Sequence, residues 1–136
     1  LYTLLTFVFL AMLNLNSLLV FSENPKALAD FYKKVFQVDP EWSEGEYRGF
    51  QAVSGHLIIG PHDKVHGKSA QPERIMFNFE TPDIKKEFER IKSLGAKVIK
   101  DPYHPSEEDK TDPDGLIATF ADPDGNFFQL MSPMKM

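Results

Sequence analysis

The sequence ADPDGNFFQLMSP, residues 121–133, predicts a tight turn that enters an apolar strand. Within Asp122-Pro123-Asp124-Gly125, the proline at the second position and the glycine at the fourth are typical of a type I β-turn. Apolar residues dominate 116–121 before this turn and 126–131 after it. Two such runs joined by a tight turn predict a β-hairpin at the end of the chain.

A helix is predicted from NPKALADFYKKVF, residues 24–36. Asn24 is a favourable N-cap, and Pro25 suits the first helical position because it lacks a backbone N–H. One apolar face follows at helical spacing, formed by Leu28, Phe31, Tyr32 and Val35. The flanking residues predict one strand before the helix and a hairpin after it, over 16–22, 48–53 and 56–59.

The same order of elements starts again after a polar linker. Residues 74–79 predict a strand, Thr81-Pro82 predicts a helix start, and a short strand and the closing hairpin follow. Three pairs of identical residues lie 57 positions apart: Glu23 and Glu80, Pro25 and Pro82, Phe31 and Phe88. This repeat predicts an α+β fold of paired βαβββ modules, residues 14–66 and 72–133, within one domain. Each module has one helix for two sheet faces, so we expect a curled mixed sheet around a cleft.

Length and composition narrow the function classes. The chain has 136 residues, enough for one compact domain with its own core. It contains no cysteine, which excludes disulfides, Cys–zinc sites and thiol catalysis. A net charge of −5 disfavours binding to nucleic acid phosphates. Twelve phenylalanines indicate thick apolar packing or an apolar ligand cleft.

Residues 1–13 form an almost wholly apolar extension. No Lys or Arg precedes it, as a signal peptide would require, and polar residues from Asn14 on make it too short to span a membrane. We therefore expect a cytoplasmic protein without membrane contact, with export by an N-terminal signal as the alternative. A charge-free segment of this length is poorly tolerated in water, so we expect it to pack across a homodimer contact as an edge strand.

The order of elements, the helix NPKALADFYKKVF and the closing ADPDGNFFQLMSP resemble the vicinal oxygen chelate superfamily over about residues 14–133. That superfamily includes glyoxalase I, extradiol dioxygenases, fosfomycin-resistance enzymes and bleomycin-resistance proteins. The resemblance implies a cleft that usually holds one divalent metal, with ligands from the first and last strands of each module. It places those four positions at Ser17, Ile59, Arg74 and Gln129, with an uncertainty of one residue at Ile59.

These four residues do not form a metal-binding set. The serine hydroxyl is a weak ligand, isoleucine is none, and the arginine is a fixed cation. One neutral amide oxygen from Gln129 does not hold a divalent ion. The residues therefore predict a cleft without a cofactor, and a divalent metal held by unusual ligands stays open as the alternative.

Two functions remain open. The first is metal-free binding of a small molecule, similar to that of bleomycin-resistance proteins, with Arg74 as an anchor for a carboxylate or carbonyl oxygen. The aromatic residues expected to line such a cleft are Trp42, Tyr47, Phe50, Phe77 and Phe127. The second is a lyase, isomerase or dioxygenase similar to glyoxalase I, in which a metal polarises a substrate oxygen. The sequence identifies no catalytic base for that reaction, and Glu46 and Glu80 are the nearest carboxylates.

Overall fold

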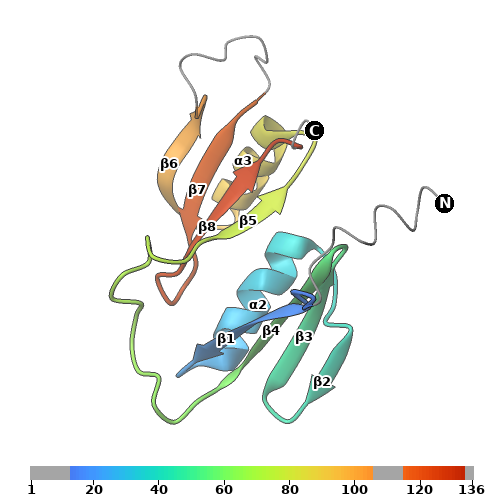
Figure 1. Ribbon diagram of the computed structural model, residues 1–136. Coiled ribbons are helices and arrows are strands. Elements are labelled where there is room, and N and C mark those ends of the chain that lie inside the picture. Colours follow the sequence, from blue (N-terminus) through green and yellow to red (C-terminus); the bar gives the residue numbers. More distant parts are fainter. Residues whose placement is uncertain (1–12, 106–114, 134–136) are drawn as a thin grey trace, which may run out of the picture.

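The computed structural model describes residues 13–105 and 115–133, and its first module has four strands and one helix (Figure 1). Strand β1 (Ser17–Ser22) leads into helix α2 (Pro25–Phe36), and the module continues with β2 (Trp42–Glu44), β3 (Tyr47–Ala52) and β4 (Gly55–Pro61). The strand β2 is absent from the sequence-based prediction because its three residues are too few to show an alternation. The Asn24 side chain accepts a hydrogen bond from the backbone N–H of Ala27 at 3.5 Å, as expected of an N-cap.

The second module repeats this order. Its elements are β5 (Phe77–Glu80), α3 (Ile84–Ser93), β6 (Lys97–Tyr103), β7 (Ile117–Ala121) and β8 (Phe127–Met131). The strand orders are β1-β4-β3-β2 and β5-β8-β7-β6, so each module forms a mixed four-stranded sheet. The first and last strands of each module are parallel neighbours, and the remaining pairs are antiparallel. The prediction of an α+β fold from paired βαβββ modules is confirmed.

Helix α2 joins the two sheets into one core. On one side the Phe36 ring contacts Phe50 of β3, with 5.6 Å between ring centroids. On the other side it contacts Phe79 of β5 at 5.1 Å, and Phe31 contacts Phe128 of β8 at 5.9 Å. Buried side chains from both modules therefore form a single apolar cluster around this helix. We call the side of each sheet that faces the helices its helix face, and the opposite side its open face.

The two sequence motifs that carry the family resemblance are bonded to each other. The hydroxyl of Tyr32 in α2 donates a 2.7 Å hydrogen bond to the Asp122 carboxylate, and both side chains are buried. The other carboxylate oxygen accepts the backbone N–H groups of Asp124 and Asn126, which fixes the turn between β7 and β8. Burial raises the pKa of Asp122, and these hydrogen bonds offset part of that rise.

The second module begins later than the sequence predicts. Strand β5 starts at Phe77 rather than at Arg74, and the N-cap of α3 is Asp83 rather than Thr81. Thr81 instead accepts a hydrogen bond from the backbone N–H of Asp83, as Ser22 does from Asn24. Matching the N-caps Asn24 and Asp83 gives a structural repeat of 59 residues. The prediction that equivalent positions lie 57 residues apart was therefore wrong.

The N-terminal extension lies outside the described residues up to residue 12, and its predicted strand and subunit contact stay predictions. In the described part of the chain, no helix is long and apolar enough to span a membrane.

Candidate functional site

The open face of the first sheet carries two aromatic rings that lie on glycines. A Cβ atom added at Gly49 would come within 2.2 Å of the Trp42 indole nitrogen. A Cβ atom at Gly60 would come within 2.2 Å of the Tyr47 ring. The two missing side chains therefore let both rings lie against the sheet backbone, and Trp42 and Tyr47 are still 38% and 37% exposed.

Neighbouring strands make this face mostly apolar. Leu19 pairs with Ile58, and Ile58 pairs with Gly49, so Leu19 shares a row with the glycine under Trp42. Leu19 is 59% exposed. At the edge of the face, His56 Nε2 lies 3.1 Å from a carboxylate oxygen of Glu41. We call the surface formed by Leu19, Trp42, Tyr47 and Ile58 the aromatic face.

The open face of the second sheet is polar across its middle. Strand register places one row across all four strands, formed by Asn78, Gln129, Thr119 and Lys100. The Gln129 amide donates to the Thr119 hydroxyl at 3.2 Å. Lys100 Nζ lies 4.1 Å from the centroid of the Tyr103 ring, a cation–π contact. This row offers amide and hydroxyl groups and one cation to a bound molecule.

The four positions that the family resemblance assigns to a metal site do not lie together in the structure. Ser17 and Gln129 lie on open faces, in different sheets. Ile59 lies on the helix face and is fully buried in the core, so its placement in a cleft was wrong. Matching the parallel pairs of the two modules makes Ile58 the counterpart of Gln129.

Arg74 lies before β5, in an exposed turn. Its guanidinium donates two hydrogen bonds to the Gln71 side-chain oxygen, at 3.1 and 2.7 Å. Its role as a ligand anchor stays a prediction. On the 59-residue repeat, the residue that corresponds to Ser17 is Met76.

The aromatic candidates divide into two groups. Phe50 and Phe77 are buried on helix faces, so they belong to the core rather than to a ligand site. Phe127 lies on the open face of β8, because its neighbour Phe128 points into the core. Trp42 and Tyr47 lie on the aromatic face. Trp42 and Tyr47 differ from the core aromatics because each ring lies on a glycine of the neighbouring strand. These glycines were not part of the sequence-based prediction.

These positions do not fit a divalent metal. Divalent ions need carboxylate or imidazole ligands. The four positions offer instead a serine hydroxyl, an isoleucine, one amide, and either the Met76 thioether or the Arg74 guanidinium. Over residues 13–105 and 115–133, no three His, Asp or Glu side chains lie close enough to hold a metal ion.

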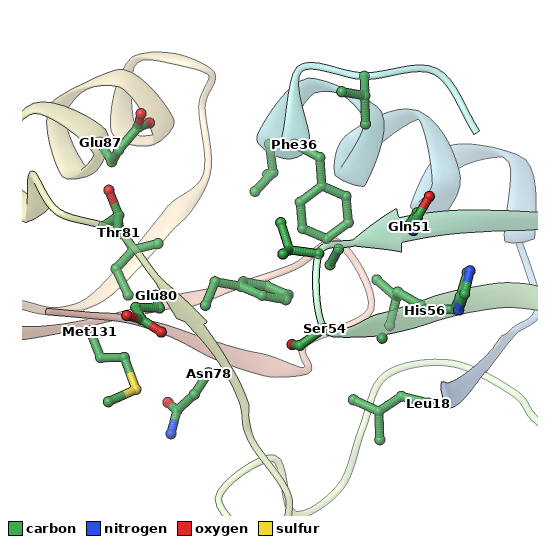
Figure 2. A pocket seen from close by; sticks show the side chains of 18 of the residues that line it. Leu18, Phe36, Gln51, Ser54, His56, Asn78, Glu80, Thr81, Glu87 and Met131 are labelled. Carbon is green, nitrogen blue, oxygen red and sulfur yellow. The ribbon is translucent and has the colours of Figure 1, made fainter. Parts of the chain in front are cut away.

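A separate groove lies between the modules, beside the C-terminal end of α2. Its volume is about 930 Å³. Figure 2 shows Phe36 between two walls, with Glu80, Asn78 and Met131 on one side and Gln51, His56 and Leu18 on the other. The groove is thus lined by both modules, and none of the four residues that define the aromatic face lines it.

The order β1-β4-β3-β2, its repetition in β5-β8-β7-β6 and the Tyr32–Asp122 link define a protein of the vicinal oxygen chelate class. The family model of the glyoxalase-like domain matches residues 17–131. The chain therefore belongs to the glyoxalase-like domain family. No curated protein matches the sequence.

Solved structures with low sequence identity share the fold. A glyoxalase/bleomycin resistance protein/dioxygenase family enzyme from Burkholderia phytofirmans is 19% identical, with a TM-score of 0.69 over 90% of this chain and 100% of that chain. The fosfomycin resistance protein FosX from Listeria monocytogenes is 20% identical, with a TM-score of 0.60 over 92% and 95%. TnmS3, an antibiotic binding protein from a Streptomyces species, is 20% identical, with a TM-score of 0.64 over 92% and 99%.

Proposed function

We propose that this protein binds a flat aromatic small molecule on its aromatic face and does so without a metal. The observation that carries the proposal is the placement of Trp42 and Tyr47 over Gly49 and Gly60. Each ring is held flat and keeps more than a third of its surface open to solvent. An aromatic pair contributes about 0.5–1.5 kcal/mol beyond the area it buries, so two held rings favour a planar ligand.

The chemistry of the family positions supports binding rather than metal-assisted catalysis. Ser17, Ile58 and Gln129 offer no carboxylate or imidazole to a metal or to a substrate proton. The fold also serves a binding role elsewhere, since TnmS3 is an antibiotic binding protein. In this chain the ligand would rest on the Trp42 and Tyr47 rings.

A second copy of the chain would complete the site. The described residues of one chain leave both open faces without a covering element, and the edge strand β1 exposes Leu18 and Leu19. A homodimer that covers the aromatic face would exclude water from the stacked ligand. Sedimentation of the purified protein, with Leu19→Lys as the interface variant, tests this step. We expect a dimer that the substitution dissociates, and a wild-type monomer would contradict it.

The binding proposal is tested on the indole N–H signal of Trp42, the one tryptophan of the chain. Naphthoate and naphthol serve as probes, titrated in the presence of EDTA and followed by ¹H–¹⁵N NMR. We expect a saturable shift with a Kd below about 1 mM for at least one probe, unchanged by the chelator.

Gly49→Ala is the critical variant, because the new methyl group displaces the indole without removing it. We expect it to weaken probe binding about tenfold or more while the protein stays folded. Gln37→Ala, at the C-cap of α2 and outside the aromatic face, is the control and should bind like the wild type. No saturable shift, or a shift that needs an added divalent metal, would contradict the proposal and favour the enzymatic alternative.

A further inference from the structure

The groove between the modules has an apolar floor and a polar rim. Side chains from the core form the floor, among them Val35, Phe36, Phe79, Ile91 and Leu130. Its volume of about 930 Å³ is in the range of pockets that hold drug-sized ligands. The Phe36 and Phe79 rings meet edge to face inside it, with 5.1 Å between centroids.

The cation in the groove is already neutralised. Arg90 of α3 pairs with Glu87, and the same guanidinium donates to the backbone carbonyls of Lys34 and Val35 at 3.0 and 2.6 Å. On the opposite wall, His56 is paired with Glu41. The groove therefore presents no cation free to attract an anionic ligand among the described residues that line it.

The groove does present uncompensated negative charge. Glu80 is exposed at the end of β5, and none of the ion pairs among the described residues includes it. Figure 2 shows it on the wall of the groove, on the same side as Asn78 and Met131.

We propose that this groove is a second small-molecule site, separate from the aromatic face, and that it takes an apolar ammonium compound. The hydrocarbon part lies on Phe36 and Phe79, whose rings also favour a nearby cation. The ammonium group lies against Glu80. The apolar floor and the unpaired carboxylate together select this class over anions and over neutral polar molecules.

Naphthylmethylammonium is the probe, and naphthalenemethanol is its neutral counterpart with the same ring. Binding is followed by NMR on the Met131 methyl group and the Thr81 amide, both in the lining of the groove. We expect the ammonium probe to bind with a Kd below about 1 mM and the alcohol to bind about tenfold more weakly. Trp42, which is not among the lining residues, reports the other site in the same spectra.

Three variants isolate the cause. Glu80→Gln should weaken the ammonium probe about tenfold and leave the alcohol unchanged. Val38→Lys puts a cation on the exposed rim and should abolish binding of the ammonium probe. Glu89→Gln, an exposed position on α3 outside the groove lining, is the matched control and should have no effect.

Equal affinity of the wild type and Glu80→Gln for the ammonium probe would overturn the proposal, as would the absence of saturable shifts at Met131 and Thr81 up to about 10 mM probe. Neither result affects the binding proposal for the aromatic face, because Trp42 and the Gly49→Ala variant report that site independently.

Discussion

Tyr32 and Asp122 are 90 positions apart in the chain and form a buried hydrogen bond between the two modules. Each residue also belongs to its own local structure, Tyr32 to the buried side of α2 and Asp122 to the turn before β8. A buried carboxylate needs such donors, since an unsatisfied oxygen in the core is costly. The pair therefore couples the fold of the helix to the fold of the hairpin.

Replacing Tyr32 by Phe should lower the free energy of unfolding by about 1–2 kcal/mol, because the ring stays and one donor to Asp122 is lost. Urea unfolding monitored by circular dichroism measures the change. Tyr47→Phe removes a hydroxyl that donates only a long bond at the surface, and should change the stability by less than about 0.5 kcal/mol. Equal effects of the two substitutions would contradict the role of the pair.

Asp122 also gives the stability a specific pH dependence. Burial raises its pKa in the folded state above the usual 3.8, so between pH 3.8 and that raised pKa the folded protein binds more protons than the unfolded chain. This contribution is fully present below pH 3.8 and is lost as the pH rises through the raised pKa.

Asp122→Asn removes that titration and keeps one oxygen as an acceptor for the turn. The stability of the wild type relative to Asp122→Asn should therefore fall as the pH rises from 3.8. Parallel urea titrations of both proteins across this window measure the difference. A relative stability that rises with pH would show that the hydrogen bonds to the carboxylate outweigh its burial.

Val53 has an unfavourable backbone conformation at the tip of the β3–β4 hairpin. Its φ is 21° and its side chain is fully exposed, so a β-branched residue is held there without packing in return. Val53→Asn should raise the stability by about 1 kcal/mol and the Tm by about 4 °C. Val38→Asn, at an exposed loop position without a positive φ, should leave the Tm nearly unchanged. A lower Tm for Val53→Asn would contradict the strain.

At the scale of elements, α2 depends on α3 for its C-terminal end. The carbonyls of the last turn of a helix lack partners within the helix, and Arg90 of α3 donates to two of them. The planar guanidinium reaches both carbonyls and Glu87 at once, which a lysine ammonium cannot reproduce. This contact fixes how the two helices meet at the groove.

Arg90→Ala should therefore lower the free energy of unfolding by about 1–3 kcal/mol, and Arg90→Lys should recover little of the loss. Lys92→Ala, on the same helix and away from α2, is the control with an expected change below about 0.5 kcal/mol. Thermal unfolding of the three variants measures these changes. Full recovery with lysine would mean that charge alone, rather than the two carbonyl bonds, stabilises the contact.

The sequence predicted most elements because their signals are local. Asn24-Pro25 and the Asp122–Gly125 turn specify a helix start and a hairpin through their own backbone preferences. The start of α3 was misplaced because Thr81-Pro82 and Asp83 both carry N-cap chemistry, and only the position of Ile84 on the core decides between them. Short β2 carries no alternation that a pattern could detect.

The candidate site was harder to predict, because face assignment depends on register. Ile58 and Ile59 are indistinguishable in sequence, yet one lies on the open face and the other in the core. Phe50 and Trp42 were likewise equivalent candidates for lining a ligand cleft, because the sheet face on which each lies depends on strand register. The two glycines under the rings, and the polar row that Asn78 and Lys100 complete, depend on pairing between strands and leave no local signal.

At the scale of the whole molecule, the fold serves two surfaces on opposite sides of the sheets. The helix faces share α2 and form the core, and our proposals for a ligand and for a second copy of the chain therefore concern the open faces. Membership of the glyoxalase-like family accounts for the fold over residues 17–131. The residues at the family's metal positions include no carboxylate or imidazole. For this reason we propose that this protein binds a small molecule and does not catalyse a reaction.

The central claim is metal-independent binding of an aromatic molecule on the aromatic face, and the Trp42 indole signal tests it most directly. Naphthoate or naphthol is titrated into the wild type and into Gly49→Ala, first in EDTA and then with a divalent metal in place of the chelator. The account predicts a saturable shift in the wild type that is the same in both conditions and at least about tenfold weaker in Gly49→Ala. Binding that appears only with the metal, or that is equal in the two proteins, would contradict it.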